Sequence, residues 1–82
     1  MLLRSKPNPV KDALYLNFRN ESLKDINVEI VNITGQKVFS SVYKCNQAQM
    51  ELNINLNEIT AGVYFVILSN EKGSEKYKFV RE

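Results

Sequence analysis

Histidine and tryptophan are absent from this chain of 82 residues, and Cys45 is its only cysteine. Without histidine the chain lacks the usual general base and cannot build a Ser/His or Cys/His nucleophile. A single cysteine cannot close a disulfide within the chain, and it cannot form a structural metal site by itself. We therefore expect no enzymatic activity, no metal and no cofactor.

The chain also lacks a strong excess of charge and a long apolar run. Eleven Lys and Arg are nearly balanced by nine Asp and Glu, which gives a formal net charge of +2. No basic residue lies between Lys44 and Lys72, so the basic stripe typical of nucleic-acid binding is missing. No apolar run approaches the ~20 residues of a membrane-spanning helix, so we expect no membrane insertion. Ten asparagines stand out, and we interpret them as a compositional bias of the source genome.

What the chain does contain is a repeated alternation of apolar and polar side chains. Met50 to Asn57 alternates without error, which is typical of a strand with one buried face. Val63 to Leu68 is apolar throughout, which predicts a central strand covered on both faces. The expected strands are 13–18, 26–32, 37–44, 50–57, 63–68 and a last one containing Tyr77, Phe79 and Val80, with a possible seventh around 2–6.

Strands at this spacing, separated by turns and without a helical stretch, predict one all-β domain over residues 1–82. We expect an immunoglobulin-like antiparallel β-sandwich of six to seven strands. In the third strand, alternation places the even-numbered residues of 38–42 on one face and the odd-numbered residues of 39–43 on the other. The expected inner faces of the two sheets consist of Leu14, Leu16, Ile26, Val28, Leu52, Ile54, Leu56, Tyr64 and Val66.

One local pattern indicates how the chain crosses between the sheets. In Leu56-x-x-Ile59-x-x-Gly62-x-Tyr64, a strand ends, a loop follows, and a tyrosine opens the next strand. Immunoglobulin-like sandwiches often carry a tyrosine at this corner, with its hydroxyl bonded to the backbone a few residues upstream. We expect the ring of Tyr64 to fill core while its hydroxyl is satisfied in this way.

Four short motifs occur in order along most of the chain. They are Pro7-Asn8-Pro9 followed by Asp12 and Leu14, the segment 30–38 with its glycine turn at Gly35, the crossing pattern from Leu56 to Tyr64, and the basic-apolar ending 76–82. Together, from Pro7 to Glu82, they resemble the C-terminal sorting domain of the type IX secretion system, also called the Por secretion system. The resemblance implies an immunoglobulin-like sandwich, in agreement with the alternation of the strands.

The resemblance also implies a function. Domains of this family direct an attached passenger from the periplasm across the outer membrane through the type IX translocon. A sortase-like surface protease commonly removes the domain, and the cargo reaches the cell surface or the medium. We accordingly expect a domain excised from a larger exported protein, with its cleavage site upstream. The expected partners are translocon components and the protease. An alternative is a non-catalytic adhesion or carbohydrate-binding module with an exposed aromatic strip.

The resemblance implies roles for particular residues as well. Pro7, Asn8, Pro9, Gly35, Leu56 and Ile59 are expected to be structural motif residues. We expect the hairpin 63–81 to offer a backbone edge with which a translocon component pairs. Gly62 and Tyr64 would hold the geometry of this site. The contact itself would come from Lys78, Phe79, Val80 and Arg81. Unpaired edges also favour self-association, so a homodimer through edge strands is a further expectation.

Overall fold

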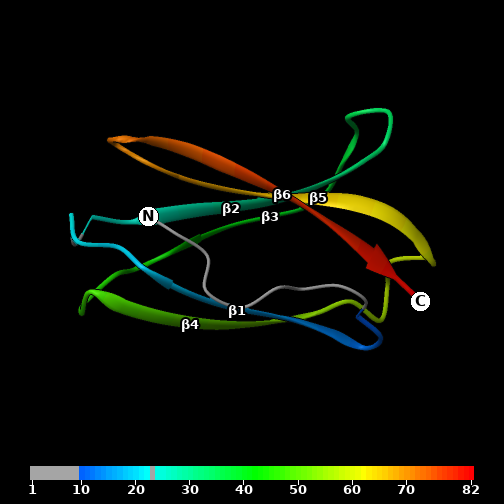
Figure 1. Ribbon diagram of the computed structural model, residues 1–82, viewed down its shortest axis with the longest axis horizontal. Coiled ribbons are helices and arrows are strands. Elements are labelled where there is room, and N and C mark those ends of the chain that lie inside the picture. Colours follow the sequence, from blue (N-terminus) through cyan, green and yellow to red (C-terminus); the bar gives the residue numbers. More distant parts are fainter. Residues whose placement is uncertain (1–9, 23) are drawn as a thin grey trace.

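The computed structural model describes residues 10–22 and 24–82, and it places six β-strands in them (Figure 1). The strands are β1 (Ala13–Arg19), β2 (Ile26–Asn32), β3 (Lys37–Tyr43), β4 (Gln49–Asn55), β5 (Gly62–Asn70) and β6 (Gly73–Arg81). The expected strand around 2–6 lies outside the described residues. Within the described part of the chain, no helix is long and apolar enough to cross a membrane.

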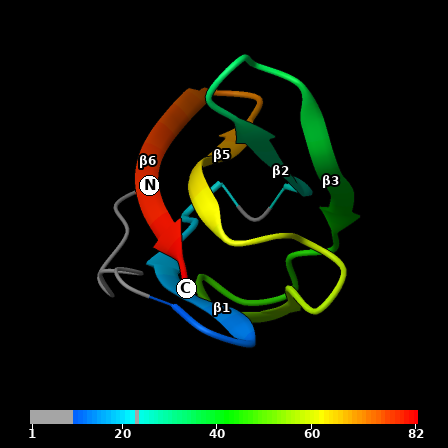
Figure 2. The same ribbon diagram turned by 90° about the vertical axis from the view of Figure 1, so that its right-hand side faces the viewer.

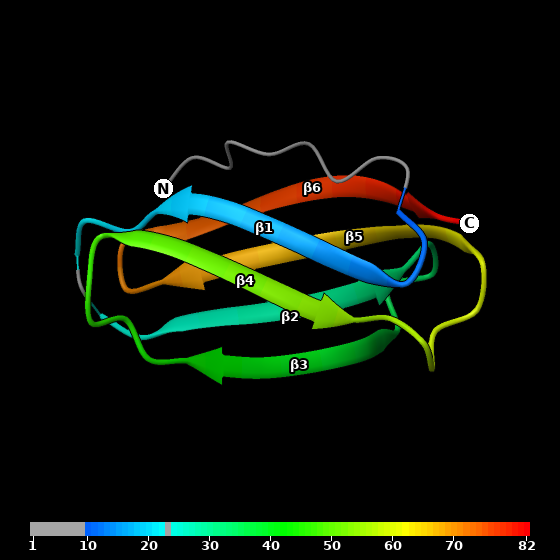
Figure 3. The same ribbon diagram turned by 90° about the horizontal axis from the view of Figure 1, so that it is seen from below.

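The strands form two antiparallel sheets that are packed face to face. One sheet contains β1 and β4, and the other has the order β3-β2-β5-β6. Viewed from below, β1 and β4 lie across the other four strands (Figure 3). The end-on view shows β3 and β6 at opposite edges of the larger sheet (Figure 2). When β1 is equated with strand B of the immunoglobulin fold, the sheet β1-β4 corresponds to strands B-E. The sheet β3-β2-β5-β6 then corresponds to strands C′-C-F-G. The predicted antiparallel sandwich is thus confirmed.

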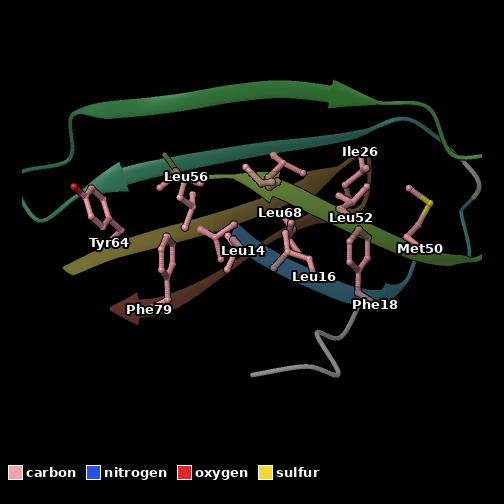
Figure 4. Close-up of a cluster of buried hydrophobic side chains, with 14 residues drawn as sticks. Leu14, Leu16, Phe18, Ile26, Met50, Leu52, Leu56, Tyr64, Leu68 and Phe79 are labelled. Atoms are coloured by element: carbon pink, nitrogen blue, oxygen red, sulfur yellow. The ribbon is translucent and has the colours of Figure 1, made fainter. Parts of the chain in front are cut away.

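The core lies between the two sheets, where alternate side chains of each strand point inward. All nine residues expected on the inner faces are buried. Five further side chains complete this cluster, namely Phe18, Ile30, Met50, Leu68 and Phe79. Figure 4 shows Tyr64 and Phe79 at one end of the core, and Phe18 and Met50 at the other. The two-residue period of the sequence therefore located the core correctly, because a one-residue shift would turn every side chain outward.

The structure corrects the expectation for β5 in the larger sheet and adds the position of β3. Strand β5 is central, between β2 and β6, but Phe65 and Ile67 on its outer face are only half-buried. The prediction of cover on both faces was wrong, because no described element packs over that face. Strand β3 lies at the edge, where Phe39 and Tyr43 pack against the core and Val42 is exposed.

The turns are closed by asparagine side chains. The Oδ1 atom of Asn32 accepts hydrogen bonds from the backbone N–H groups of Thr34 and Gln36, at 3.1 and 2.9 Å. Gly35 lies between them with φ of 87°, a left-handed conformation that glycine adopts without steric cost. Asn55 and Asn70 make the same type of bond to an N–H two residues ahead. Compositional bias is thus an insufficient reading of the asparagines, since these three hold specific turns.

Candidate recognition surface

The crossing from β4 to β5 is held by Tyr64. Its hydroxyl donates a hydrogen bond to the carbonyl oxygen of Thr60 at 2.7 Å, and the Thr60 hydroxyl lies 3.3 Å away. The tyrosine itself is buried, with 6% of its surface exposed. Gly62 precedes it with φ of 155°, which L side chains rarely adopt. These contacts confirm the predicted tyrosine corner and explain the spacing of Gly62 and Tyr64.

Leu56 and Ile59 complete this corner from the loop side. Leu56 is fully buried and Ile59 packs against the core. The Leu56 carbonyl oxygen accepts a hydrogen bond from the Ile59 N–H at 2.9 Å. The same oxygen lies 3.4 Å from Nε and from Nη2 of Arg81. Arg81 therefore ties the C-terminal strand to the end of β4.

The pairing of β5 with β6 brings together the residues to which recognition was assigned. Gly62 lies opposite Arg81, and Tyr64 lies opposite Phe79. The rings of Tyr64 and Phe79 stack with their centroids 5.8 Å apart. Asn32 of β2 pairs with Tyr64 on its other side, so the Gly35 turn lies at this same end of the sheet. Pro7, Asn8 and Pro9 lie outside the described residues.

Phe79 does not lie where a contact residue should. It is fully buried between the sheets, so its side chain cannot touch a partner while the sandwich is intact. Lys78 is exposed, and Val80 and Arg81 are half-buried. The expectation of a contact through Phe79 therefore needs correction: strand alternation turns Phe79 into the core and its two neighbours outward.

The outer side of the β5–β6 hairpin carries a mixed basic and apolar surface. We use the term hairpin face for the outward side chains of Phe65, Ile67, Lys76, Lys78 and Val80. The ammonium group of Lys76 lies over the Phe65 ring, 4.5 Å from its centroid, within the range of a cation–π contact. Phe65 and Lys76 were not among the expected contact residues. Because Tyr64 and Val66 were expected on the inner face, strand alternation already placed Phe65 outward. The alternation of Lys76-Tyr77-Lys78-Phe79 does the same for Lys76.

The backbone edge of β6 is partly occupied near its end. The N–H of Val10 donates to the Val80 carbonyl oxygen at 2.9 Å, and the N–H of Glu82 donates to the Val10 carbonyl oxygen at 2.8 Å. Val10 thereby forms a parallel bridge with Arg81. A partner strand that paired with this end of β6 would have to displace Val10. Among the described residues, no group of three His, Cys, Asp or Glu side chains could hold a metal ion.

Comparison with known families identifies the chain. Residues 7–82 match the family described as "Secretion system C-terminal sorting domain". The chain belongs to this family. It is the sorting domain of type IX secretion, so the resemblance of the four motifs is confirmed. The family consists of sorting signals and not of catalysts. No curated protein and no solved structure matches the chain.

Membership gives the domain its general role. It is a C-terminal sorting signal for type IX secretion, and it interacts with the secretion machinery. Such a signal implies a secreted protein that passes through the periplasm to the cell surface or the extracellular space. The corner at Tyr64 and the hairpin that follows it both lie within the matched residues.

Proposed function

We propose that this domain carries an attached passenger across the outer membrane through the type IX translocon, and that a translocon component binds its hairpin face. The observation that supports this surface is the placement of Lys76 and Lys78 beside half-buried Phe65 and Ile67 on the outside of the last hairpin. The matched family supplies the role of the domain. The proposal thus transfers the contact from the backbone edge of β6 to the outer side chains of β5 and β6.

The chemistry of this face defines the partner surface. Two ammonium groups favour carboxylates, which would steer the encounter and fix its orientation. The half-buried apolar side chains supply area whose burial stabilises the complex. A translocon component that binds here should therefore present an apolar patch with Asp or Glu at its rim. Gly62, Tyr64, Phe79 and Arg81 act from behind this face by holding the hairpin in place.

We further propose that a sortase-like surface protease removes the domain after transport, at a site upstream of the folded sandwich. The closed sandwich offers such a protease little substrate, because proteases need extended and accessible backbone. A homodimer through unpaired edge strands is a separate proposal.

A reporter assay tests the sorting role. Residues 1–82 are fused to the C-terminus of a fluorescent protein that carries a periplasmic export signal. The fusion is expressed in a bacterium with the type IX machinery and in a translocon-deficient mutant. We expect reporter at the cell surface or in the medium only in the competent strain, and loss of the domain's mass shows processing. Retention of the reporter in the periplasm of both strains contradicts the sorting role of this segment.

Charge reversal on the hairpin face tests the contact surface. The double variant Lys76→Glu/Lys78→Glu is compared with Lys24→Glu/Lys44→Glu, which makes the same change of net charge at exposed positions outside the hairpin. We expect the hairpin variant to be secreted at least tenfold less than the control, with both domains folded. Equal secretion of the two variants contradicts recognition through the hairpin face. Point substitutions are preferable to removing Val80 to Glu82, because that deletion also removes the ties to Val10 and Leu56.

A carbohydrate-binding or adhesion module has no specific support in this fold. Such a module needs an exposed aromatic strip, but among the described residues Tyr15 is the only aromatic residue that is exposed. The remaining aromatic side chains are buried or half-buried in strands. The sorting role therefore accounts for the chain better than the alternative.

A further inference from the structure

The outer edge of β6 is paired with Val10 at its C-terminal end. Strand β6 borders β5 on one side, and no strand of the described chain lies on its other side (Figure 2). The Val10 N–H donates to the Val80 carbonyl oxygen at 2.9 Å, and the Val10 carbonyl oxygen accepts from the Glu82 N–H at 2.8 Å. These two bonds make a parallel bridge between Val10 and Arg81. Because the bridge is parallel, an extended chain that enters Val10 would arrive along this edge from the direction of Gly73.

The bridge also determines which side chains share a face of the sheet. Val10 is half-buried and packs against the core. Its partner Arg81 reaches inward, with Nε 3.4 Å from the Leu56 carbonyl oxygen. Successive side chains of a strand alternate between its two faces. In an extended chain before Val10, the residues with even numbers would therefore face inward, and those with odd numbers would face the outer side of the hairpin.

We propose that residues 2–9, which lie outside the described residues, continue this bridge as a seventh strand that pairs in parallel with the rest of the β6 edge. Residues 2–10 match the length of β6, which has 9 residues. The segment is therefore long enough to cover the whole edge. The bridge of Val10 with Arg81 sets the register of the other pairs. Directly opposite each other would be Asn8 and Phe79, Lys6 and Tyr77, Arg4 and Glu75, and Leu2 and Gly73.

The positions of the two prolines fit this register. Val10 directs its N–H and C=O at β6, and this direction alternates along a strand, so Lys6 and Asn8 would share it. Pro7 and Pro9 occupy the alternate positions, where an N–H would point away from β6. Proline has no N–H, so it would remove a ladder bond at the first kind of position and removes none at the second. On the outer side of an edge strand, prolines also prevent pairing with any further strand.

Charge complementarity favours this segment as the occupant of the edge. Arg4 would lie opposite Glu75, a half-buried carboxylate on the inward side of β6. The exposed Lys76 and Lys78 would lie opposite uncharged residues. A shift of one residue in either direction would instead place Lys6 opposite one of these lysines, and like charges directly opposite each other are destabilising. These matches and the covalent continuity of the segment with the bridge single out residues 2–9.

A seventh strand would determine how partners reach the domain. The backbone edge of β6 would be occupied along its length, so a partner would meet side chains there and not a pairing edge. Pro7 and Pro9 would lie beside Lys78 and Val80, at the border of the hairpin face. A passenger joined upstream would leave the sandwich beside the β5–β6 turn, at the opposite end of the sheet from Glu82. The inference itself does not rest on the proposed recognition through the hairpin face.

Amide hydrogen exchange of the full chain, followed by NMR, tests the seventh strand. Glu82 directs its N–H at Val10. By alternation, the N–H groups of Lys76 and Lys78 face the same edge, whereas that of Tyr77 faces β5. After correction for intrinsic rates, we expect the amides of Lys76 and Lys78 to exchange within about tenfold of the Tyr77 amide. Exchange that is faster than this would overturn the proposal, because it would show that the outer edge is open to water.

A pair of adjacent proline substitutions tests the register. Lys6→Pro removes an N–H that would donate to the Lys76 carbonyl oxygen, whereas Ser5→Pro removes an N–H that would point away from β6. We expect Lys6→Pro to speed the exchange of the Lys76 and Lys78 amides at least about tenfold. Ser5→Pro should change it by less than about threefold. Unchanged exchange of the Val28 amide, in the core, shows that the sandwich stays folded. Equal effects of the two substitutions, or a larger effect of Ser5→Pro, would contradict the register.

Discussion

Asn20 joins three loops at one end of the sandwich, and its replacement should strongly destabilise the domain. The side chain is fully buried. Its Nδ2 donates to the Lys24 carbonyl oxygen at 2.9 Å. Its Oδ1 accepts hydrogen bonds from the Ser22 hydroxyl and from Nδ2 of Asn70, both at 2.9 Å. The backbone N–H of Asn20 also donates to the Ala48 carbonyl oxygen at 2.7 Å.

The magnitude follows from the bonds that are lost. Asn20→Ala removes three side-chain hydrogen bonds. The Lys24 carbonyl, the Ser22 hydroxyl and the Asn70 amide then lose this partner in a region that is closed to water. At about 0.5–1.5 kcal/mol for each bond, the free energy of unfolding should fall by about 2–4 kcal/mol. A small domain has only about 5 kcal/mol or slightly more to lose. For a domain of this size the melting temperature should fall by about 10–30 °C.

Thermal and urea unfolding followed by circular dichroism measure this effect. Asn53→Ala is the matched control, because Asn53 is exposed on the outer face of β4. We expect the control to change the free energy of unfolding by less than about 0.5 kcal/mol. Asn20→Asp keeps the acceptor oxygen but directs a second oxygen at the Lys24 carbonyl. Because burial against a carbonyl oxygen raises the pKa of this carboxyl above the ordinary value of about 4, the stability of Asn20→Asp should improve as the pH falls through the folded value, and the gain should be complete below about pH 4. Equal melting of Asn20→Ala and Asn53→Ala would refute the role of Asn20.

Two further substitutions test contacts of tyrosine hydroxyls. Tyr64→Phe keeps the stacked ring but removes the hydrogen bond to the Thr60 carbonyl oxygen. Urea unfolding should therefore show that the free energy of unfolding falls by about 1–2 kcal/mol. An unchanged unfolding midpoint would contradict the corner's contribution to stability. A hydrogen bond to the Glu51 carboxylate, with smaller effects of desolvation and of the Glu51 charge, raises the pKa of Tyr15. The stability that this pair contributes is present below the pKa of unfolded tyrosine, about 10, and is lost as the pH rises through the folded value. Urea unfolding from pH 8 to 11 should therefore show a steeper decline for the native chain than for Tyr15→Phe, and parallel curves would contradict this coupling.

The alternation of side chains was sufficient to predict the strands and the core. Most strands carry a two-residue period of apolar and polar residues, and the expected ends differ from the observed ones by at most two residues at most boundaries. The period is informative here because the sandwich buries one face of each strand. The continuous apolar run of β5 shows no such period, and it was misleading. That run suggested two covered faces, whereas the outer face is only half-buried and carries the contact of Phe65 with Lys76.

The contacts between loops could not be predicted in the same way. Asn20 and Asn70 are 50 positions apart in the chain, and their hydrogen bond depends on how the two sheets bring the β1–β2 loop to the β5–β6 turn. The alternation of 50–57 places Asn53 on the exposed face, but no local pattern predicts that Asn20, in a polar turn segment, is fully buried. The turn asparagines were more accessible to prediction. Asn32 stands three residues before Gly35, and an asparagine that precedes a glycine turn is a known turn signal.

The motifs that identify the family and the surface proposed to bind its partner are not the same set of residues. Leu56, Gly62, Tyr64 and Arg81 hold the corner and the last strand together through backbone and core contacts. A substitution at any of them changes the fold first, so a loss of secretion there would not locate the contact surface. The hairpin face differs, because Lys76 and Lys78 are exposed and can be changed while the core is kept. Sorting defects at these lysines in a folded domain are therefore the result that would separate recognition from stability.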